Sequence, residues 1–320
     1  MNKILTVLLM ALLLFSVSCK KKSDLRRVTV VLDWTPNTNH AGLYVALQHG
    51  YFRDAGLDVN IIQPGQNTAD QIVASGNAQF GVSYQESVML ARAEDIPVIS
   101  IAAIMQHNTS GFAALKSANI KRPKDFEGKR YGSSGWPSEL AILETIMKDD
   151  SADFAKTKII SGVYDFFSTI GKDADFEWIY WGWDGVEAHR RNIEIDFIPI
   201  RGLNPIFDFY TPLIIANEKT VKAEPELVAA FLAAASKGYE YCIENPTAAA
   251  DILIKQVPEL NPEQVHLSMN YLSKEYRSDA DKWGMQKLEV WQRFGDWMHE
   301  KALIPVPVKA EAAFTNKYLP

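Results

Sequence analysis

The sequence predicts a two-lobed α/β protein, and two observations carry this prediction. Between residues 28 and 199, short runs rich in β-branched and aromatic residues alternate with helical runs, which is typical of parallel sheets covered by helices. After one more predicted strand, residues 213–217, the last third of the chain contains consecutive predicted helices. This order suits a chain that crosses between two lobes, near residues 106–110 and again near 210–217.

The predicted elements have clear boundaries. Gly50 and Gly76 are expected to end two of the helices, because glycine readily adopts the backbone conformation that closes a helix. The predicted strands are 28–32, 59–63, 78–83, 98–105, 111–115, 129–132, 176–180 and 195–199, and the main predicted helices are 39–49, 68–75, 137–148, 225–244, 247–256, 262–272 and 285–301.

The helical third of the chain is predicted to be mainly structural. Leu288, Trp291, Phe294 and Met298 recur at helical spacing, and we interpret this stripe as part of the core rather than as a ligand-binding face. Cys242 lies in a helical run and is expected to be a small core residue. We divide the chain into a first lobe, residues 28–106 plus 214–320, and a second lobe, residues 107–213.

The bulk composition excludes several classes of protein. The 320 residues are 47% apolar with a formal net charge of -6, so the chain can bury a large core and is neither disordered nor fibrous. No long basic stripe is present, which argues against a nucleic-acid partner. We expect a monomer.

The N-terminus is typical of an exported protein. Lys3 precedes an apolar run over residues 4–15, which is shorter than the roughly 20 residues that a membrane-spanning helix needs. We therefore predict a signal peptide, residues 1–18, and a polar tether, residues 19–27. Cys19 follows small residues as in a bacterial lipobox, which predicts a lipid anchor on Cys19 facing the periplasm or cell exterior, although Ser16 stands where leucine is usual. Export without a lipid is the alternative.

Polar and aromatic residues gather where the predicted strands of the first lobe end. Asp33, Trp34, Asn37 and His40 follow the first strand and lead into a helix, whose free backbone N–H groups point back towards the strand ends. Tyr84 follows the third strand in the same way. Since lobed α/β proteins bind ligands at strand ends, these residues form either a ligand rim or a capped connection between strand and helix.

The second lobe repeats this arrangement. Residues 132–139 combine small residues with Trp136, Ser138 and Glu139, and they resemble a cradle for an anion or a dipole, without the spacing of a P-loop or a dinucleotide fingerprint. Phe207 to Thr211, which includes Tyr210, precedes the second crossing and is expected to line the hinge side of the cleft.

The segment 178–185 is the richest in aromatic residues. Strand alternation favours Trp178 and Tyr180 as core residues, whereas Trp181 and Trp183 lie beyond the strand, where a cleft would be. Asp184 either accepts hydrogen bonds from a ligand amine or caps the following helix.

Sequence motifs for catalysis are mostly missing. The six histidines show no close metal-ligand spacing, the two cysteines are far apart, and no G-x-S-x-G elbow occurs. Asp33, Glu86, Glu139 and Asp184 are carboxylates at strand ends, which are as common in binding clefts as in active sites. We therefore expect a binding protein without a cofactor or metal.

Residues 32–40, 50–59, 135–139 and 210–212 resemble the NMT1/THI5-like solute-binding proteins of ABC transporters, including the ThiY-type proteins that bind thiamine-pyrimidine precursors. The resemblance extends over essentially the whole mature chain. It implies a type II periplasmic-binding-protein fold that closes over one ligand and delivers it to a membrane permease driven by an ATPase. It does not identify the ligand, because the wider family also includes carriers of riboflavin and alkanesulfonates.

The enzyme branch of this family is a fungal pyrimidine synthase, and its reactive residues are missing here. That branch carries a pyridoxal-phosphate lysine after the third strand, a nearby histidine and a cluster of cysteines. Ser83, Ser87 and Tyr210 stand at or near the matching positions. The resemblance therefore favours a binding protein over a synthase.

Our hypothesis for the ligand is a 4-aminopyrimidine related to hydroxymethylpyrimidine or its formylaminomethyl analogue, stacked on aromatic rings and read by carboxylates. Riboflavin or another small aromatic or sulfonated solute is the alternative. The predicted ligand-binding residues are Asp33, Trp34, Asn37, His40, Tyr84, Trp136, Ser138, Glu139, Trp181, Trp183, Asp184 and Tyr210.

Overall fold

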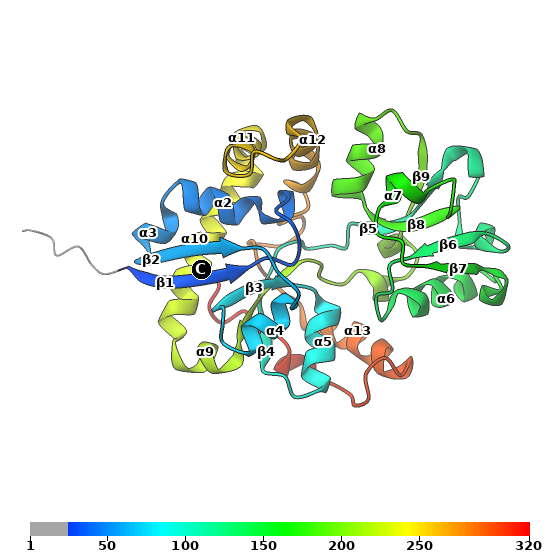
Figure 1. Ribbon diagram of the computed structural model, residues 1–320. Helices are drawn as coiled ribbons and strands as arrows, with labels where there is room; N and C mark the ends of the chain where they lie inside the picture. Colours follow the sequence, from blue (N-terminus) through cyan, green and yellow to red (C-terminus); the bar gives the residue numbers. More distant parts are fainter. Residues whose placement is uncertain (1–24) are drawn as a thin grey trace, which may run out of the picture.

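Two five-stranded sheets, each covered by helices, form the two lobes of the protein (Figure 1). The structure is a computed structural model and describes residues 25–320. The predicted signal peptide and Cys19 lie outside the described residues. The first strand already begins at Arg26, two residues earlier than expected, because Arg26 and Arg27 pair with Leu57 and Asp58.

The sheet of the first lobe has the strand order β2-β1-β3-β10-β4. We expected parallel sheets, but β10 runs antiparallel to both β3 and β4. This strand returns from the other lobe, so it enters the sheet at the end where β3 leaves it. The strands are β1 (Arg26–Val31), β2 (Leu57–Ile62), β3 (Phe80–Ser83), β4 (Val98–Ala103) and β10 (Leu213–Asn217).

The sheet of the second lobe has the order β7-β6-β8-β5-β9, in which β5 runs antiparallel to β8 and β9. The sequence gives little sign of β7, because this edge strand has only four residues and just two of them are apolar. The strands are β5 (Ser110–Leu115), β6 (Arg130–Ser133), β7 (Lys158–Ser161), β8 (Phe176–Tyr180) and β9 (Ile195–Pro199).

The chain passes between the sheets twice. Residues 104–109 lead from β4 to β5, and residues 200–212 lead from β9 back to β10. Leu213 pairs with Ser83 and Ala103 in the first sheet, so the strand predicted at residues 213–217 is confirmed and the second passage ends where it begins. The residues at which the two lobes divide, placed at 106/107 and 213/214, stay a prediction.

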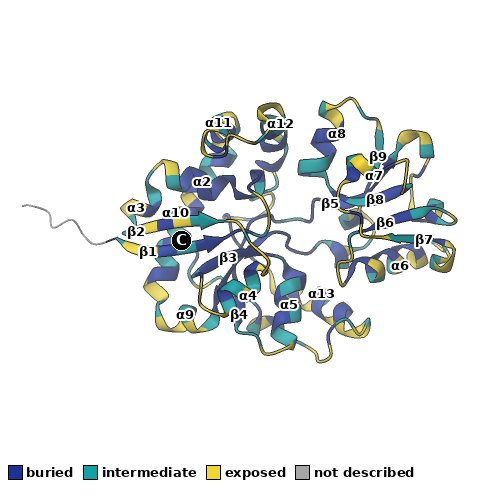
Figure 2. Ribbon diagram, in the orientation of Figure 1, coloured by how far each residue is buried: buried dark blue, intermediate teal, exposed yellow. Residues whose placement is uncertain are grey.

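Helices cover both sheets and bury most of their strand residues (Figure 2). The α-helices of the first lobe are α2 (Ala41–Gln48), α3 (Tyr51–Asp54), α4 (Ala69–Ala74), α5 (Gln85–Ala93), α9 (Glu218–Ala223), α10 (Pro225–Glu244), α11 (Pro246–Gln256), α12 (Pro262–Leu272) and α13 (Leu288–Glu300). Those of the second lobe are α6 (Glu139–Asp149), α7 (Phe166–Thr169) and α8 (Val186–Arg190).

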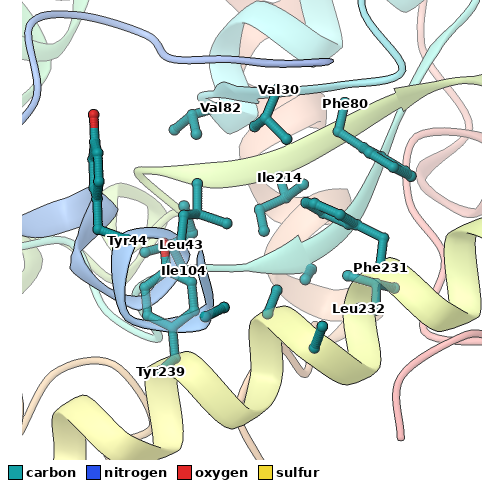
Figure 3. Close-up of a cluster of buried hydrophobic side chains, with 14 of the residues drawn as sticks. Val30, Leu43, Tyr44, Phe80, Val82, Ile104, Ile214, Phe231, Leu232 and Tyr239 are labelled. Atoms are coloured by element: carbon teal, nitrogen blue, oxygen red, sulfur yellow. The ribbon is translucent and has the colours of Figure 1, made fainter. Parts of the chain in front are cut away.

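Helix α10 forms the centre of the first lobe's core (Figure 3). The ring of Phe231 stacks on Phe80 at 3.9 Å and on Phe52 at 5.4 Å, which joins the helix to the sheet. Cys242 is fully buried in the same cluster, as expected. The close approach of α10 to α2 depends on Gly238, where a side chain would overlap the carbonyl oxygen of Gly42.

Helix α13 connects the two lobes. Phe294 stacks on Phe209 at 4.2 Å, and Trp297 meets Phe207 edge to face at 5.1 Å, so the helix packs on the second passage between the lobes. The stripe predicted as core is confirmed for Trp291, Phe294 and Met298. It is wrong for Leu288, which is the first residue of the helix and is 42% exposed.

Replacing Gly238 with alanine tests the contact between α10 and α2. Alanine normally stabilises a helix relative to glycine, but here its methyl group would push the helices apart. We expect Gly238→Ala to lower the free energy of unfolding by about 1–3 kcal/mol, measured by urea denaturation. The control is Gly202→Ala, where a methyl group meets only the Pro199 ring at 4.0 Å; an equal effect of both substitutions would contradict the packing described here.

Candidate functional site

The carboxylate of Asp33 is the most strongly organised group at the end of β1. Its two oxygens lie 2.6 Å from His40 Nε2 and 2.6 Å from the Tyr84 hydroxyl, which donates its proton. The backbone N–H of Asn37 donates to His40 Nδ1 at 3.1 Å, so Nδ1 is the acceptor and Nε2 carries the proton that points at Asp33. Asn37 therefore orients His40, and His40 orients Asp33.

These contacts also set the charge of Asp33. Burial alone would raise the pKa of Asp33, but His40 and the Tyr84 hydroxyl together lower it below its ordinary value. Burial and the neighbouring carboxylate raise the pKa of Tyr84 well above its usual value, so its hydroxyl keeps its proton. The end of β1 therefore carries an ionised carboxylate that His40 and Tyr84 hold in place.

Aromatic rings from both lobes meet beside this carboxylate. The Tyr84 ring lies 5.6 Å from Trp136, and Trp136 lies 6.1 Å from Tyr180. Tyr84 belongs to the first lobe, whereas Trp136 follows β6 and Tyr180 ends β8 of the second. Trp136 remains 38% exposed and Trp34 53% exposed, so both rings are accessible at the surface.

Tyr180 differs from the sequence prediction, which placed it in the core. Its ring is only half-buried, and its hydroxyl lies 3.5 Å from the hydroxyl of Thr211 on the passage between the lobes. Burial raises its pKa. Strand alternation could not predict that Tyr180 is only half-buried, because this last residue of β8 lies at the boundary with the other lobe.

Ser138 connects the lobes through its backbone. Its N–H donates to a carboxylate oxygen of Glu86 at 2.9 Å, and both residues are almost fully buried. Burial raises the pKa of Glu86, although the hydrogen bond from Ser138 opposes this. Glu86 was considered only as a possible acid or base, and it contributes a second carboxylate from the first lobe.

Glu139 points into its own loop. Its carboxylate accepts hydrogen bonds from the hydroxyl of Tyr131 at 2.5 Å and from the backbone N–H groups of Gly135 at 2.8 Å and Trp136 at 3.1 Å. The side chain is 3% exposed. The cradle predicted at residues 132–139 therefore exists, and its own chain fills it.

The aromatic segment after β8 forms a π-helical turn, η5 (Trp181–Gly185). The Trp181 ring packs against Phe197 of β9 at 4.9 Å, within the second lobe. One carboxylate oxygen of Asp184 accepts a hydrogen bond from the backbone of Tyr180 at 3.1 Å. Of the two alternatives for Asp184, the structure shows a cap, but on the preceding turn rather than on the following helix.

The same segment contacts α12 of the first lobe. The carbonyl of Trp183 accepts a hydrogen bond from Gln264 at 3.4 Å, and the carbonyl of Gly182 accepts one from Ser268. Nearby, Arg190 of α8 lies 3.6 Å from Glu263 of α12. Figure 1 shows these two helices facing each other across the lobes. Trp183 thus lies at the junction of the lobes.

Tyr210 lies elsewhere. It is 1% exposed, its ring is 6.4 Å from Trp291, and its hydroxyl accepts a hydrogen bond from the backbone of Lys287 at 2.8 Å. The residue supports the passage between the lobes from the side of α13. Of the predicted set, the structure gathers Asp33, His40, Tyr84 and Trp136 into one group, and direct contact of any of them with a ligand stays a prediction.

The fold is shared with solved binding proteins. The alkanesulfonate-binding protein SsuA from Xanthomonas axonopodis pv. citri, bound to MOPS, superimposes with a TM-score of 0.69 at 13% identity, over 90% of this chain and 98% of that chain. This likeness confirms the type II periplasmic-binding-protein fold that the sequence implies.

The chain belongs to the NMT1/THI5-like family, whose model matches residues 37–249. The formylaminopyrimidine-binding protein of Halalkalibacterium halodurans is 31% identical, with 98% of each chain covered. The 4-amino-5-hydroxymethyl-2-methylpyrimidine phosphate synthase of Legionella pneumophila is 26% identical, with 92% of each chain covered. Fold and family together support a solute-binding role. Separately, no helix in residues 25–320 is long and apolar enough to cross a membrane.

A pH titration of stability tests the environment of Asp184. Burial raises the pKa of Asp184 to about 6, so ionising this carboxyl costs more free energy in the folded state than in the unfolded state. The free energy of unfolding is therefore not reduced by Asp184 below about pH 4, where the carboxyl is protonated in both states, and it falls as the pH rises to 6. Asp184→Asn keeps an oxygen acceptor for Tyr180 but does not ionise. We expect it to match the wild type at pH 4 and to exceed its unfolding free energy at pH 7.5 by about 1–2 kcal/mol, after allowance for partial exposure. A variant that is less stable at both pH values would contradict this environment.

Proposed function

We propose that the protein is the extracytoplasmic solute-binding component of an ABC importer, and that its solute is a 4-aminopyrimidine of the hydroxymethylpyrimidine or formylaminopyrimidine type. The observation that carries the proposal is the ionised Asp33 carboxylate beside the accessible rings of Trp34 and Trp136. The name of the relative from Halalkalibacterium halodurans supports the same class of ligand.

Asp33 is suited to reading an amino group. A carboxylate has about four lone-pair positions, and His40 and Tyr84 each use one, on different oxygens. Each oxygen can therefore accept one more hydrogen bond from a ring amine, and because the side chain is only 6% exposed, the amine reaches it when the lobes separate. Because the carboxylate is already fixed and ionised, little reorganisation is needed when the ligand binds.

Trp136 and Tyr84 supply aromatic faces from opposite lobes. A planar ring that stacks between them requires the two side chains, now 5.6 Å apart, to separate. Binding would thus be coupled to a small opening and closing of the lobes, with Ser138 and Glu86 rejoining on closure. Aromatic stacking adds about 0.5–1.5 kcal/mol per pair beyond the burial of surface.

The synthase alternative has little support in the residues of this chain. Ser83, which stands where the enzyme branch carries its lysine, donates its hydroxyl proton to Asp70 at 2.9 Å. Neither Ser83 nor Ser87 can form the imine that a lysine forms with pyridoxal phosphate. We therefore propose reversible binding rather than turnover.

Calorimetric titration tests the ligand class. We expect 4-amino-5-hydroxymethyl-2-methylpyrimidine or its formylaminomethyl analogue to bind in the micromolar range or tighter, with riboflavin and taurine much weaker. Binding of riboflavin or taurine with no heat from either pyrimidine would refute the proposal and favour the alternative solutes.

Asp33→Asn tests the carboxylate directly. Losing a hydrogen bond to a charged group costs about 1.5–3 kcal/mol, so the Kd for the pyrimidine should rise about 10- to 150-fold. The matched control is Asp175→Asn, because Asp175 pairs with Arg130 at the amino ends of β6 and β8, far from the strand ends that carry the site. Equal affinity of Asp33→Asn and wild type would rule out Asp33 as the reader of the amine.

We further propose that a lipid anchor on Cys19 holds this binding protein at the membrane, beside the permease and its ATPase. Mass spectrometry of the mature protein should show an N-terminal Cys19 carrying a diacylglycerol thioether, and Cys19→Ser should release the protein from the membrane fraction. An unmodified N-terminus in soluble material would instead indicate export without an anchor.

A further inference from the structure

The loop between β6 and α6 has the form of an anion-binding site. The backbone N–H groups of Ser134, Gly135 and Trp136 converge at the amino end of an eleven-residue helix, where the helix dipole favours negative charge. Gly135 adopts a φ of +87°, which aims the neighbouring N–H groups inwards. The hydroxyls of Tyr131 and Ser133 point to the same place.

The carboxylate of Glu139 already satisfies these donors. Its oxygens accept from Tyr131 at 2.5 Å, Ser133 at 2.9 Å, Gly135 at 2.8 Å, Trp136 at 3.1 Å and Ser134 at 3.2 Å. The side chain is 3% exposed, so water and other anions have little access to the donors. The cradle is thus neutralised from within the chain.

This filled cradle borders the proposed binding site. Trp136 donates its backbone N–H to Glu139, while its ring faces Tyr84 of the other lobe. The next turn of the loop meets Glu86 through Ser138. An anionic group on a ligand stacked against Trp136 would find no free donor in the cradle and would face carboxylates instead.

We propose that Glu139 determines the charge class of the ligand: by occupying the cradle, it restricts binding to pyrimidines without a phosphate or sulfonate group. This inference rests on the proposed function and deepens it. An anionic ligand would be repelled by the Glu139 carboxylate and would find the N–H donors of the cradle already bonded to it. This selection against anions adds to the attraction of the ligand amine to Asp33.

The first test uses the wild-type protein. Titration with 4-amino-5-hydroxymethyl-2-methylpyrimidine and with its phosphate monoester should give a Kd for the monoester at least about 30-fold higher, because like charges at an interface cost several kcal/mol. Equal or tighter binding of the monoester would overturn the proposal. This arm needs no substitution and so does not depend on the folding of a variant.

The second test empties the cradle. In Glu139→Ala, inorganic sulfate should occupy the released donors and raise the melting temperature relative to chloride at equal ionic strength, whereas the wild type should show no difference. Glu86→Gln is the matched control, because it removes a carboxylate charge from the same junction but leaves Glu139 in place; it should respond like the wild type.

The outcomes separate this inference from the proposed function. If a folded Glu139→Ala variant shows no sulfate effect, or if Glu86→Gln shows the same effect, the role of Glu139 is refuted even when the pyrimidine binds. If neither pyrimidine binds the wild type but sulfate stabilises only Glu139→Ala, the proposed ligand is wrong and the exclusion of anions by Glu139 holds.

Discussion

The hydrogen bonds of the Asp33 carboxylate with His40 and Tyr84 are the interaction on which the site depends. They join the end of β1 to the start of two helical segments, and they keep a charge in place that burial would otherwise remove. Asn37 completes the arrangement by fixing the tautomer of His40. The first lobe therefore presents one oriented acceptor at the carboxyl ends of its strands.

The second lobe contributes in a different way. Its strand ends also carry carboxylates, but Glu139 and Asp184 bind backbone groups of their own turns. What this lobe offers to the other is mainly aromatic surface, from Trp136 and Tyr180. The oriented carboxylate thus comes from the first lobe alone, whereas aromatic rings come from both lobes, a combination that suits the proposed amino-substituted ring.

The sequence predicted the α/β class and the helical return, because these depend on local periodicity and on turn residues. It did not predict that β5 and β10 run antiparallel, since strand direction depends on where the chain re-enters each sheet. Residue types at strand ends indicated the group of Asp33, His40, Tyr84 and Trp136 that the structure brings together, but side-chain direction did not follow from them. Glu139 turns back into its loop, where its carboxylate accepts hydrogen bonds from the backbone N–H groups of Gly135 and Trp136 before the helix.

A ligand-bound crystal structure tests the central claim most directly. With 4-amino-5-hydroxymethyl-2-methylpyrimidine bound, the exocyclic amine should lie within hydrogen-bonding distance of Asp33 and the ring should stack on Trp136, with His40 and Tyr84 still bonded to the carboxylate. A pyrimidine found elsewhere, or one bound between the lobes without contact to Asp33, would contradict the account.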